Sequence, residues 1–149
     1  MKIMFVCHGN ICRSPMAEFI FADLVKKRGL QGFEVASCAT STEEIGNPVY
    51  PPARAELAKH GISCKGKYAV QLTKADYQKY DMLICMDNYN LRNMLRMLGG
   101  DPEGKISLLM DYAGGGEVAD PWYCGGFDKT YEDILAGCNG LLDKLTNNR

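Results

Sequence analysis

Two apolar runs, separated by segments of helical periodicity, constrain the fold more than any other feature of the chain. Residues 3–6 and 82–86 carry no charged side chain, which is typical of parallel strands that are buried on both faces. Apolar side chains recur at helical spacing in three further segments, which are residues 17–25, 91–98 and 127–145. Because strands and helices alternate, the sequence predicts the α/β class, with a single doubly wound domain over residues 1–149.

Glycine, proline and short apolar stretches predict the remaining elements. These are strands at residues 33–36 and 106–109, a helix over about residues 53–60, and a long Gly-rich loop that ends near residue 126. Ser14 is expected to cap the first helix, with Pro15 in its first turn. In the last helix, Gly137 and Gly140 each cost roughly 1 kcal/mol relative to alanine, and we expect them to permit close packing.

The charge balance argues against a broadly basic or membrane-binding surface. The chain of 149 residues has 17 Lys and Arg against 18 Asp and Glu, which is a formal net charge of -1. Such a balance is not typical of domains that bind nucleic acid or anionic membranes. No apolar run approaches the roughly 18 residues of a membrane span, and the first residues resemble a strand rather than a signal peptide. We therefore expect no nucleic acid and no membrane among the partners.

The seven cysteines indicate a reducing environment. Their number is odd, no Cys-x-x-Cys pair occurs, and the two histidines, His8 and His60, lie far apart in the sequence. This pattern argues against a disulfide framework and against a structural zinc site. We expect a cytoplasmic protein without metal or cofactor, in which most thiols are small buried side chains.

The turn after the first strand carries the residues with the clearest chemistry. In doubly wound folds, ligands bind at the carboxyl ends of the strands, where a loop that enters a helix points several backbone N–H groups at one anion. Cys7 begins this turn and Arg13 ends it. A loop wrapped around an oxyanion would place the Cys7 sulfur beneath the anion and the Arg13 guanidinium against two of its oxygens.

The same turn favours nucleophilic attack on phosphorus. The helix dipole and the arginine would stabilise a thiolate at Cys7, and attack on a bound phosphoryl group would give a cysteinyl-phosphate. Ser14 could donate a hydrogen bond to this sulfur, while Gly9 and Asn10 are residue types that accept the positive φ of a tight loop. The pattern Cys-x5-Arg-Ser/Thr arises by chance in roughly 0.02 places per chain of this composition. We therefore expect inorganic phosphate or another oxyanion to bind in the loop.

Several segments give the chain a resemblance to a known family. Residues 6–15, with the sequence VCHGNICRSP, resemble the signature of the low-molecular-weight protein tyrosine phosphatases. Residues 120–123, DPWY, resemble that family's second motif, and smaller matches occur at residues 46–48, 60–62 and 86–90. The resemblance implies a four-stranded parallel sheet flanked by helices on both faces. It also implies a two-step hydrolysis of phosphomonoesters that needs no metal.

The resemblance further implies roles for individual residues. It assigns Cys7 as the nucleophile, Arg13 as the phosphate clamp and Asp120 as the general acid. The other expected substrate-binding residues belong to the same two motifs and are His8, Gly9, Asn10, Ile11, Cys12, Ser14, Trp122 and Tyr123. The last two would flank the mouth of the site and pack against an aromatic leaving group.

The implied substrates are tyrosine-phosphorylated proteins and small aryl phosphates, acted on by a monomer or a weak dimer. A network of Asn10, Ser14, Ser37 and His60 would hold the phosphate-binding loop in shape. Cys12 could form a reversible disulfide with the nucleophile and protect it from irreversible oxidation.

Three other activities fit part of this pattern. An arsenate reductase needs two more cysteines for a disulfide relay, but the next cysteine after Cys85 is Cys124, beyond the following helix. A protein arginine phosphatase has threonine where this chain has Ile11. A non-catalytic phosphotyrosine-binding module would not need the complete catalytic set. Glu43, near where some family members have an aromatic wall, and Cys124 leave the substrate preference open.

Overall fold

The computed structural model describes residues 1–147, apart from the side chains of Tyr123 and Cys124. Its centre is a four-stranded, entirely parallel sheet with the order β2-β1-β3-β4. The strands are β1 (Lys2–Cys7), β2 (Glu34–Ala39), β3 (Met82–Cys85) and β4 (Ile106–Leu108). Successive strands pair on opposite sides of β1, so the strand order reverses there, and this is where doubly wound folds bind ligands.

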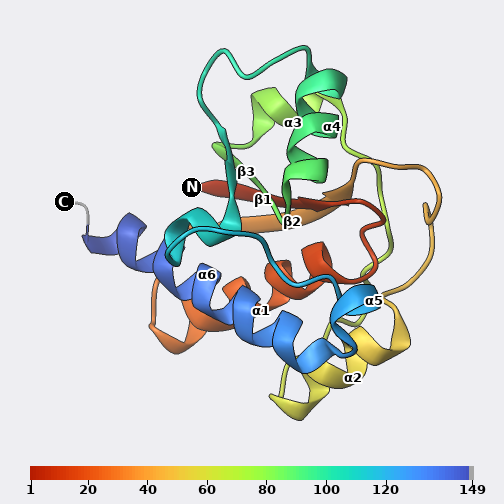
Figure 1. The fold of residues 1–149 in the computed structure, drawn as a ribbon. Helices are drawn as coiled ribbons and strands as arrows, with labels where there is room; N and C mark the ends of the chain where they lie inside the picture. The colour runs from red at the N-terminus through yellow and green to blue at the C-terminus, as the bar shows by residue number, and fades with distance from the viewer. Residues whose placement is uncertain (148–149) are drawn as a thin grey trace.

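Helices cover both faces of the sheet (Figure 1). One face packs against α1 (Arg13–Lys27), α2 (Pro51–Lys59) and α6 (Phe127–Asn147), and the other against α3 (Lys74–Lys79) and α4 (Asn88–Leu98). Side chains of β1 alternate between two apolar cores: Phe5 belongs to the first and Val6 to the second. Burial on both faces explains why the strand has no polar side chain at these positions, and it confirms the predicted fold class.

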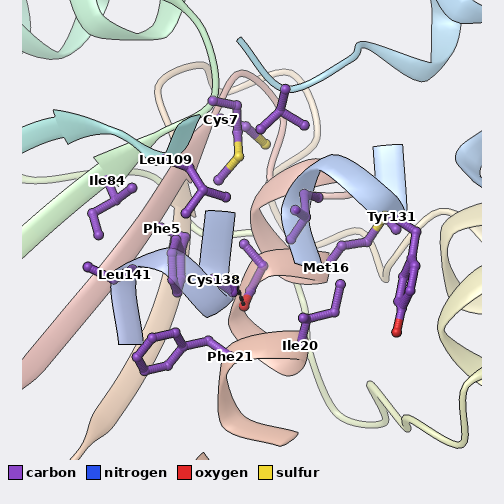
Figure 2. Close-up of a cluster of buried hydrophobic side chains, with 14 of the residues drawn as sticks. Phe5, Cys7, Met16, Ile20, Phe21, Ile84, Leu109, Tyr131, Cys138 and Leu141 are labelled. Atoms are coloured by element: carbon purple, nitrogen blue, oxygen red, sulfur yellow. Dashed lines mark hydrogen bonds between the residues drawn. The ribbon is translucent and has the colours of Figure 1, made fainter. Parts of the chain in front are cut away.

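Figure 2 shows the larger core, with Cys7 at one end of the cluster, near Leu109 and Phe5. The last helix, α6, packs along this core against α1 and the short 3-10 helix η1 (Leu109–Tyr112). A Cβ atom at Gly137 would lie 2.5 Å from Leu109 Cγ, and one at Gly140 would overlap the carbonyl oxygen of Tyr112. The two glycines therefore permit the close packing that the sequence predicts.

The structure corrects several boundaries. Helix α1 begins at Arg13, with Cys12 at its N-cap position, so Ser14 lies inside the helix and is not its cap. The expected Gly-rich loop contains a short helix, α5 (Pro121–Cys124). Helix α3 was not expected, because it buries only Tyr77 and has no apolar repeat. None of the described helices combines the length and apolarity needed to cross a bilayer.

Candidate active site

The phosphate-binding loop, defined here as residues 8–12, connects the last residue of β1 to the first residue of α1. Asn10 has φ of 59°, and it is the only described residue other than glycine with positive φ. Its backbone N–H points at Cys7 Sγ, 3.3 Å away, and Ser14 Oγ lies 3.0 Å from the same sulfur. The loop thus turns back over Cys7, and two polar groups surround its thiol.

Gly9 has a different role from the one expected. Gly9 does not have a positive φ, and Asn10 is the residue of the loop that does. A Cβ atom at Gly9 would lie 3.4 Å from Glu44 Cγ, at ordinary van der Waals distance. The side chain of Glu44 therefore lies directly against the loop at Gly9.

A buried hydrogen-bond network holds the loop from behind. The Asn10 amide donates to Ser14 Oγ at 2.8 Å and to Ser37 Oγ at 3.0 Å, and its oxygen accepts from the Val70 N–H at 3.1 Å. Asn10 and Ser14 are 1% and 0% exposed. They therefore support the loop rather than line the cavity above it. Such bonds offset the strain of a left-handed backbone in a residue other than glycine.

His60 does not belong to this network, contrary to expectation. Its Nε2 donates a hydrogen bond to Glu56 Oε2 at 3.1 Å, and its ring stacks on Tyr131, with ring centroids 3.7 Å apart. The network instead continues through Glu18, which accepts from Ser37 Oγ at 2.6 Å, and Lys67, whose ammonium donates to the Ser37 carbonyl oxygen at 2.8 Å. Lys67 lies far from the loop in the sequence, so no local pattern indicates its contact with this network.

Arg13 is almost fully buried, with a side chain that is 7% exposed. Its guanidinium pairs with Asp87 at 2.9 Å and donates to the Val118 carbonyl oxygen at 3.2 Å. Burial lowers the pKa of Arg13, but the nearby Cys7 and Asp87 outweigh it, so the pKa is raised above its usual value. Arg13 therefore stays charged, in a fixed orientation, beside the Cys7 sulfur.

Asp87, which fixes Arg13, also forms a capping box at the start of α4. Its side chain accepts from the Asn90 N–H at 2.8 Å, and Asn90 Oδ1 accepts from the Asp87 N–H at 3.2 Å. The sequence contains this Asp-x-x-Asn pattern, but nothing local indicates that the carboxylate also reaches Arg13.

Asp120 approaches the same guanidinium nitrogen as Asp87, with 3.8 Å between Asp120 Oδ2 and Arg13 Nη2. It is the N-cap residue of α5 and accepts from the Trp122 N–H at 3.0 Å. The preceding residue, Ala119, is tied to α6 through Asp133 and Thr130. These anchors fix the segment that carries Asp120.

Above the loop lies a cavity of about 580 Å³. It is lined by Cys7, His8, Gly9, Ile11, Cys12, Arg13, Glu43, Glu44, Asp87, Tyr89, Asn90, Asp120, Pro121 and Trp122. Trp122 is 63% exposed, and its ring centroid lies 5.0 Å from that of Tyr50. The expected role of Tyr123 falls on a side chain outside those that the structure describes. A second hollow, of about 540 Å³ beside α2, contains none of the expected site residues.

Burial dominates the surroundings of two other described cysteines, Cys12 and Cys85. Burial, reinforced by Cys7 and Asp120, raises the pKa of Cys12 to about 12. Cys85 is fully buried in β3, and burial raises its pKa to about 12 as well. It lies outside the cavity, and the side chain of Cys124 is outside the described set. Among the described residues, no three His, Cys, Asp or Glu side chains gather in a way that could hold a metal ion.

Comparison with known protein families places this geometry in context. The family model for low molecular weight phosphotyrosine protein phosphatase matches residues 2–149. A low molecular weight protein-tyrosine-phosphatase of Bacillus subtilis, YfkJ, is 38% identical over 149 residues, covering 97% of this chain and 96% of the relative. The low molecular weight phosphotyrosine protein phosphatase of Gallus gallus is 39% identical, covering 96% and 94% of the two chains.

Solved structures agree with these sequence matches. The crystal structure of YfkJ from Bacillus subtilis superposes with a TM-score of 0.94 at 37% identity, covering 100% of this chain and 96% of that one. A Drosophila arginine phosphatase superposes with a TM-score of 0.87 at 32% identity, covering 97% and 98%. The whole-length matches and the shared fold show that the chain belongs to the low molecular weight phosphotyrosine protein phosphatase family.

Proposed function

We propose that the protein hydrolyses phosphotyrosine on proteins through a cysteinyl-phosphate formed on Cys7. The observation that carries the proposal is the arrangement at the cavity floor. Cys7 Sγ lies 3.0 Å from Ser14 Oγ, and the carboxylates of Asp87 and Asp120 lie 2.9 and 3.8 Å from the guanidinium of the buried Arg13. A nucleophile, a fixed cation and a carboxylic acid therefore border one cavity.

In the first step, the backbone N–H groups of the loop and Arg13 bind the phosphoryl oxygens. The Cys7 thiolate attacks phosphorus, the bond to the tyrosine oxygen breaks, and Asp120 gives its proton to that oxygen. The tyrosine then leaves as a neutral phenol. The fixed Asp120 segment supplies this proton without a large rearrangement of the protein.

In the second step, Asp120 accepts a proton from a water molecule that attacks the phosphorus. The sulfur–phosphorus bond breaks and inorganic phosphate is released. Ser14 Oγ, at hydrogen-bond distance from the Cys7 sulfur, stabilises the thiolate as it leaves. The second step thus restores the Cys7 thiolate and the protonated carboxyl group of Asp120.

The cavity walls support an aromatic substrate. Trp122 presents an exposed ring next to Tyr50, and Ile11 adds apolar surface on the loop. Ile11 also disfavours the arginine phosphatase alternative. An arsenate reductase is not favoured because Cys85, the cysteine expected to start a relay, is buried outside the cavity.

The setting of the protein is part of the same proposal. The six cysteines that the structure describes are all free, which supports a reducing cytoplasm. We further propose a monomer or weak dimer whose partners are tyrosine-phosphorylated proteins, with free phosphate binding in the loop as the product.

Three variants test the proposal against an aryl phosphate and a phosphotyrosine peptide. Cys7→Ser is expected to abolish turnover while retaining phosphate binding, and Asp120→Ala to slow the first step by about 10²–10⁴-fold. Cys64→Ala, which removes a buried thiol from the second hollow, is the matched control and should retain activity. Full activity in Cys7→Ser would contradict the covalent route.

A further inference from the structure

The cavity carries far more negative than positive charge on its walls. Four carboxylates line it, from Glu43, Glu44, Asp87 and Asp120. Arg13 and His8 are the only basic side chains among the described lining residues. Arg13 already faces the two aspartates, at 2.9 and 3.8 Å. Neither glutamate therefore has an arginine or lysine partner among the described lining residues.

Glu44 lies close to the phosphate-binding loop. Its Cγ would be 3.4 Å from a Cβ atom at Gly9, so its aliphatic stem packs on the loop itself. Its carboxylate accepts a hydrogen bond from the Asn47 amide at 2.6 Å. Because an amide is neutral, this bond orients the carboxylate and leaves its charge in place. The pKa of Cys12 is raised mainly by burial and then by Cys7 and Asp120, and the charge of Glu44 adds to this increase. The charge of Glu44 therefore acts on groups inside the cavity.

Glu43 extends the same negative surface outward. Its side chain is 68% exposed and lies 3.0 Å from His8 Nε2. His8 is itself half-exposed, and its ring centroid is 6.0 Å from that of Tyr89. When His8 is neutral, the pair keeps the full charge of the carboxylate. The cavity lining also includes Trp122, whose ring packs against Tyr50.

We propose that Glu43 and Glu44, together the acidic wall, select phosphotyrosine sites that have a lysine or arginine next to the phosphotyrosine. This rests on the phosphotyrosine hydrolysis proposed above and names its substrate class. A phosphate dianion that enters beside two glutamates is repelled by them. A neighbouring cation on the substrate offsets that repulsion, and a neighbouring glutamate adds to it.

The geometry of a peptide suits this contact. Consecutive residues of an extended chain are at most about 3.6 Å apart, so a residue beside the phosphotyrosine stays close to the mouth of the cavity. A lysine or arginine side chain has the length to reach a carboxylate on the rim. Because Trp122 carries no charge, the acidic wall is the part of the mouth that distinguishes charge.

Three phosphotyrosine peptides that differ only in the two flanking residues, Lys, Gln or Glu, test the proposal. We expect kcat/KM to fall in the order Lys, Gln, Glu, with about three- to tenfold between the first and last at low salt, as for exposed charge pairs. The ratio should shrink in 0.5 M NaCl, where the Debye length is only about 3–5 Å.

A double variant assigns the preference to the acidic wall. In Glu43→Gln/Glu44→Gln, the ratio of kcat/KM between the Lys and Glu peptides is expected to fall close to one. The ratio is taken within each variant, so changes in folded fraction or intrinsic rate cancel. The matched control is Glu34→Gln/Glu103→Gln, which removes two exposed charges at the amino ends of the strands, and it should keep the wild-type ratio.

The outcomes separate this inference from the proposed function. Equal kcat/KM for the three peptides, a preference for Glu, or a preference that survives in the Glu43→Gln/Glu44→Gln variant would overturn the acidic wall. Loss of hydrolysis for every peptide and for an aryl phosphate would overturn the proposed function, and this inference with it.

Discussion

The floor and the rim of the cavity are built in opposite ways. The floor, Cys7 to Ser14, consists of groups such as Asn10 and Arg13 that are buried and engaged in several hydrogen bonds. The rim carries Glu43 and Trp122, which are largely exposed and have few partners. A floor held by many contacts keeps the reacting groups in one arrangement, whereas an exposed rim can change without disturbing the fold. We therefore expect floor substitutions to affect turnover and stability, and rim substitutions to affect substrate choice.

The largest expected effect concerns the shape of the cation in the floor. Arg13→Lys keeps the charge but loses the planar fork that contacts Asp87 and Val118 in this structure. We expect kcat/KM for an aryl phosphate to fall by about 10²–10³-fold, as when an oxyanion donor is removed. Arg54→Lys on α2 is the control. A loss below tenfold in Arg13→Lys would show that charge alone is sufficient.

The next test concerns the strain that the floor contains. Asn10→Ala removes the hydrogen bonds to Ser14 and Ser37, leaves the Val70 N–H without its partner, and puts at positive φ a residue type that tolerates this conformation less well than asparagine. We expect the free energy of unfolding to fall by about 2–4 kcal/mol, measured by urea denaturation.

Asn10→Gly separates the two causes, since glycine adopts positive φ without strain. It should be more stable than Asn10→Ala by about 1 kcal/mol. Asn147→Ala, at the exposed last residue of α6, is a control expected to stay within about 0.5 kcal/mol of wild type. Equal stability of the two Asn10 variants would rule out backbone strain as a contributor.

A third test uses the thiol next to the nucleophile. Mild peroxide converts the Cys7 thiolate to a sulfenic acid, and attack by the Cys12 thiolate then forms a disulfide and releases hydroxide. Burial raises the pKa of Cys12 to about 12. At any pH well below this pKa, the thiolate fraction of Cys12 increases about tenfold for each unit by which the pH is raised.

The disulfide should therefore form about tenfold faster with each unit of pH between pH 7 and 9. Mass spectrometry can follow it against sulfenic acid trapped with dimedone. A Cys12→Ala variant provides the baseline. Detection of Cys7 sulfonic acid alone would argue against any protective role of Cys12.

The smallest expected effect lies at the rim. Trp122→Ala should raise KM for an aryl phosphate about three- to tenfold, through the loss of aromatic packing. Because the side chain is 63% exposed, the free energy of unfolding should change by less than about 0.5 kcal/mol. Tyr68→Ala, at an aromatic side chain that is 57% exposed and outside the cavity, is the matched control. A large loss of stability in Trp122→Ala would contradict the expectation that rim substitutions affect substrate binding and not the fold.

The sequence predicted the parts of the fold that rest on long apolar patterns. Strands β1 and β3 are buried on both faces, and α6 shows five turns of helical periodicity, so each leaves a clear signal. Helix α3 begins with a capping box of Thr73 and Asp76, but a single buried side chain gives no repeat to detect. Ser14 was misplaced as a cap because a serine before a proline looks the same whether its hydroxyl meets a backbone N–H or a thiol.

The site divides along the same line. Residues of the floor are contiguous in the sequence, so spacing alone brings Cys7 and Arg13 together. The groups that orient them come from distant segments: Asp87 is separated from Arg13 by 74 positions, and Lys67 from Ser37 by 30. Pairings of this kind depend on tertiary packing, so no local sequence pattern predicts them.

The two glycines of α6 have a consequence for how inactivating mutations should be distributed. Gly137 and Gly140 let η1 lie directly on the helix, and the chain that leaves η1 leads on to Asp120. A side chain at either glycine would push η1 away from α6. The displacement would reach the segment after η1 and move the carboxyl group of Asp120 away from its position beside Arg13. A random screen for catalytically dead but folded protein should therefore recover substitutions at these glycines, in a helix that contributes no residue to the cavity lining.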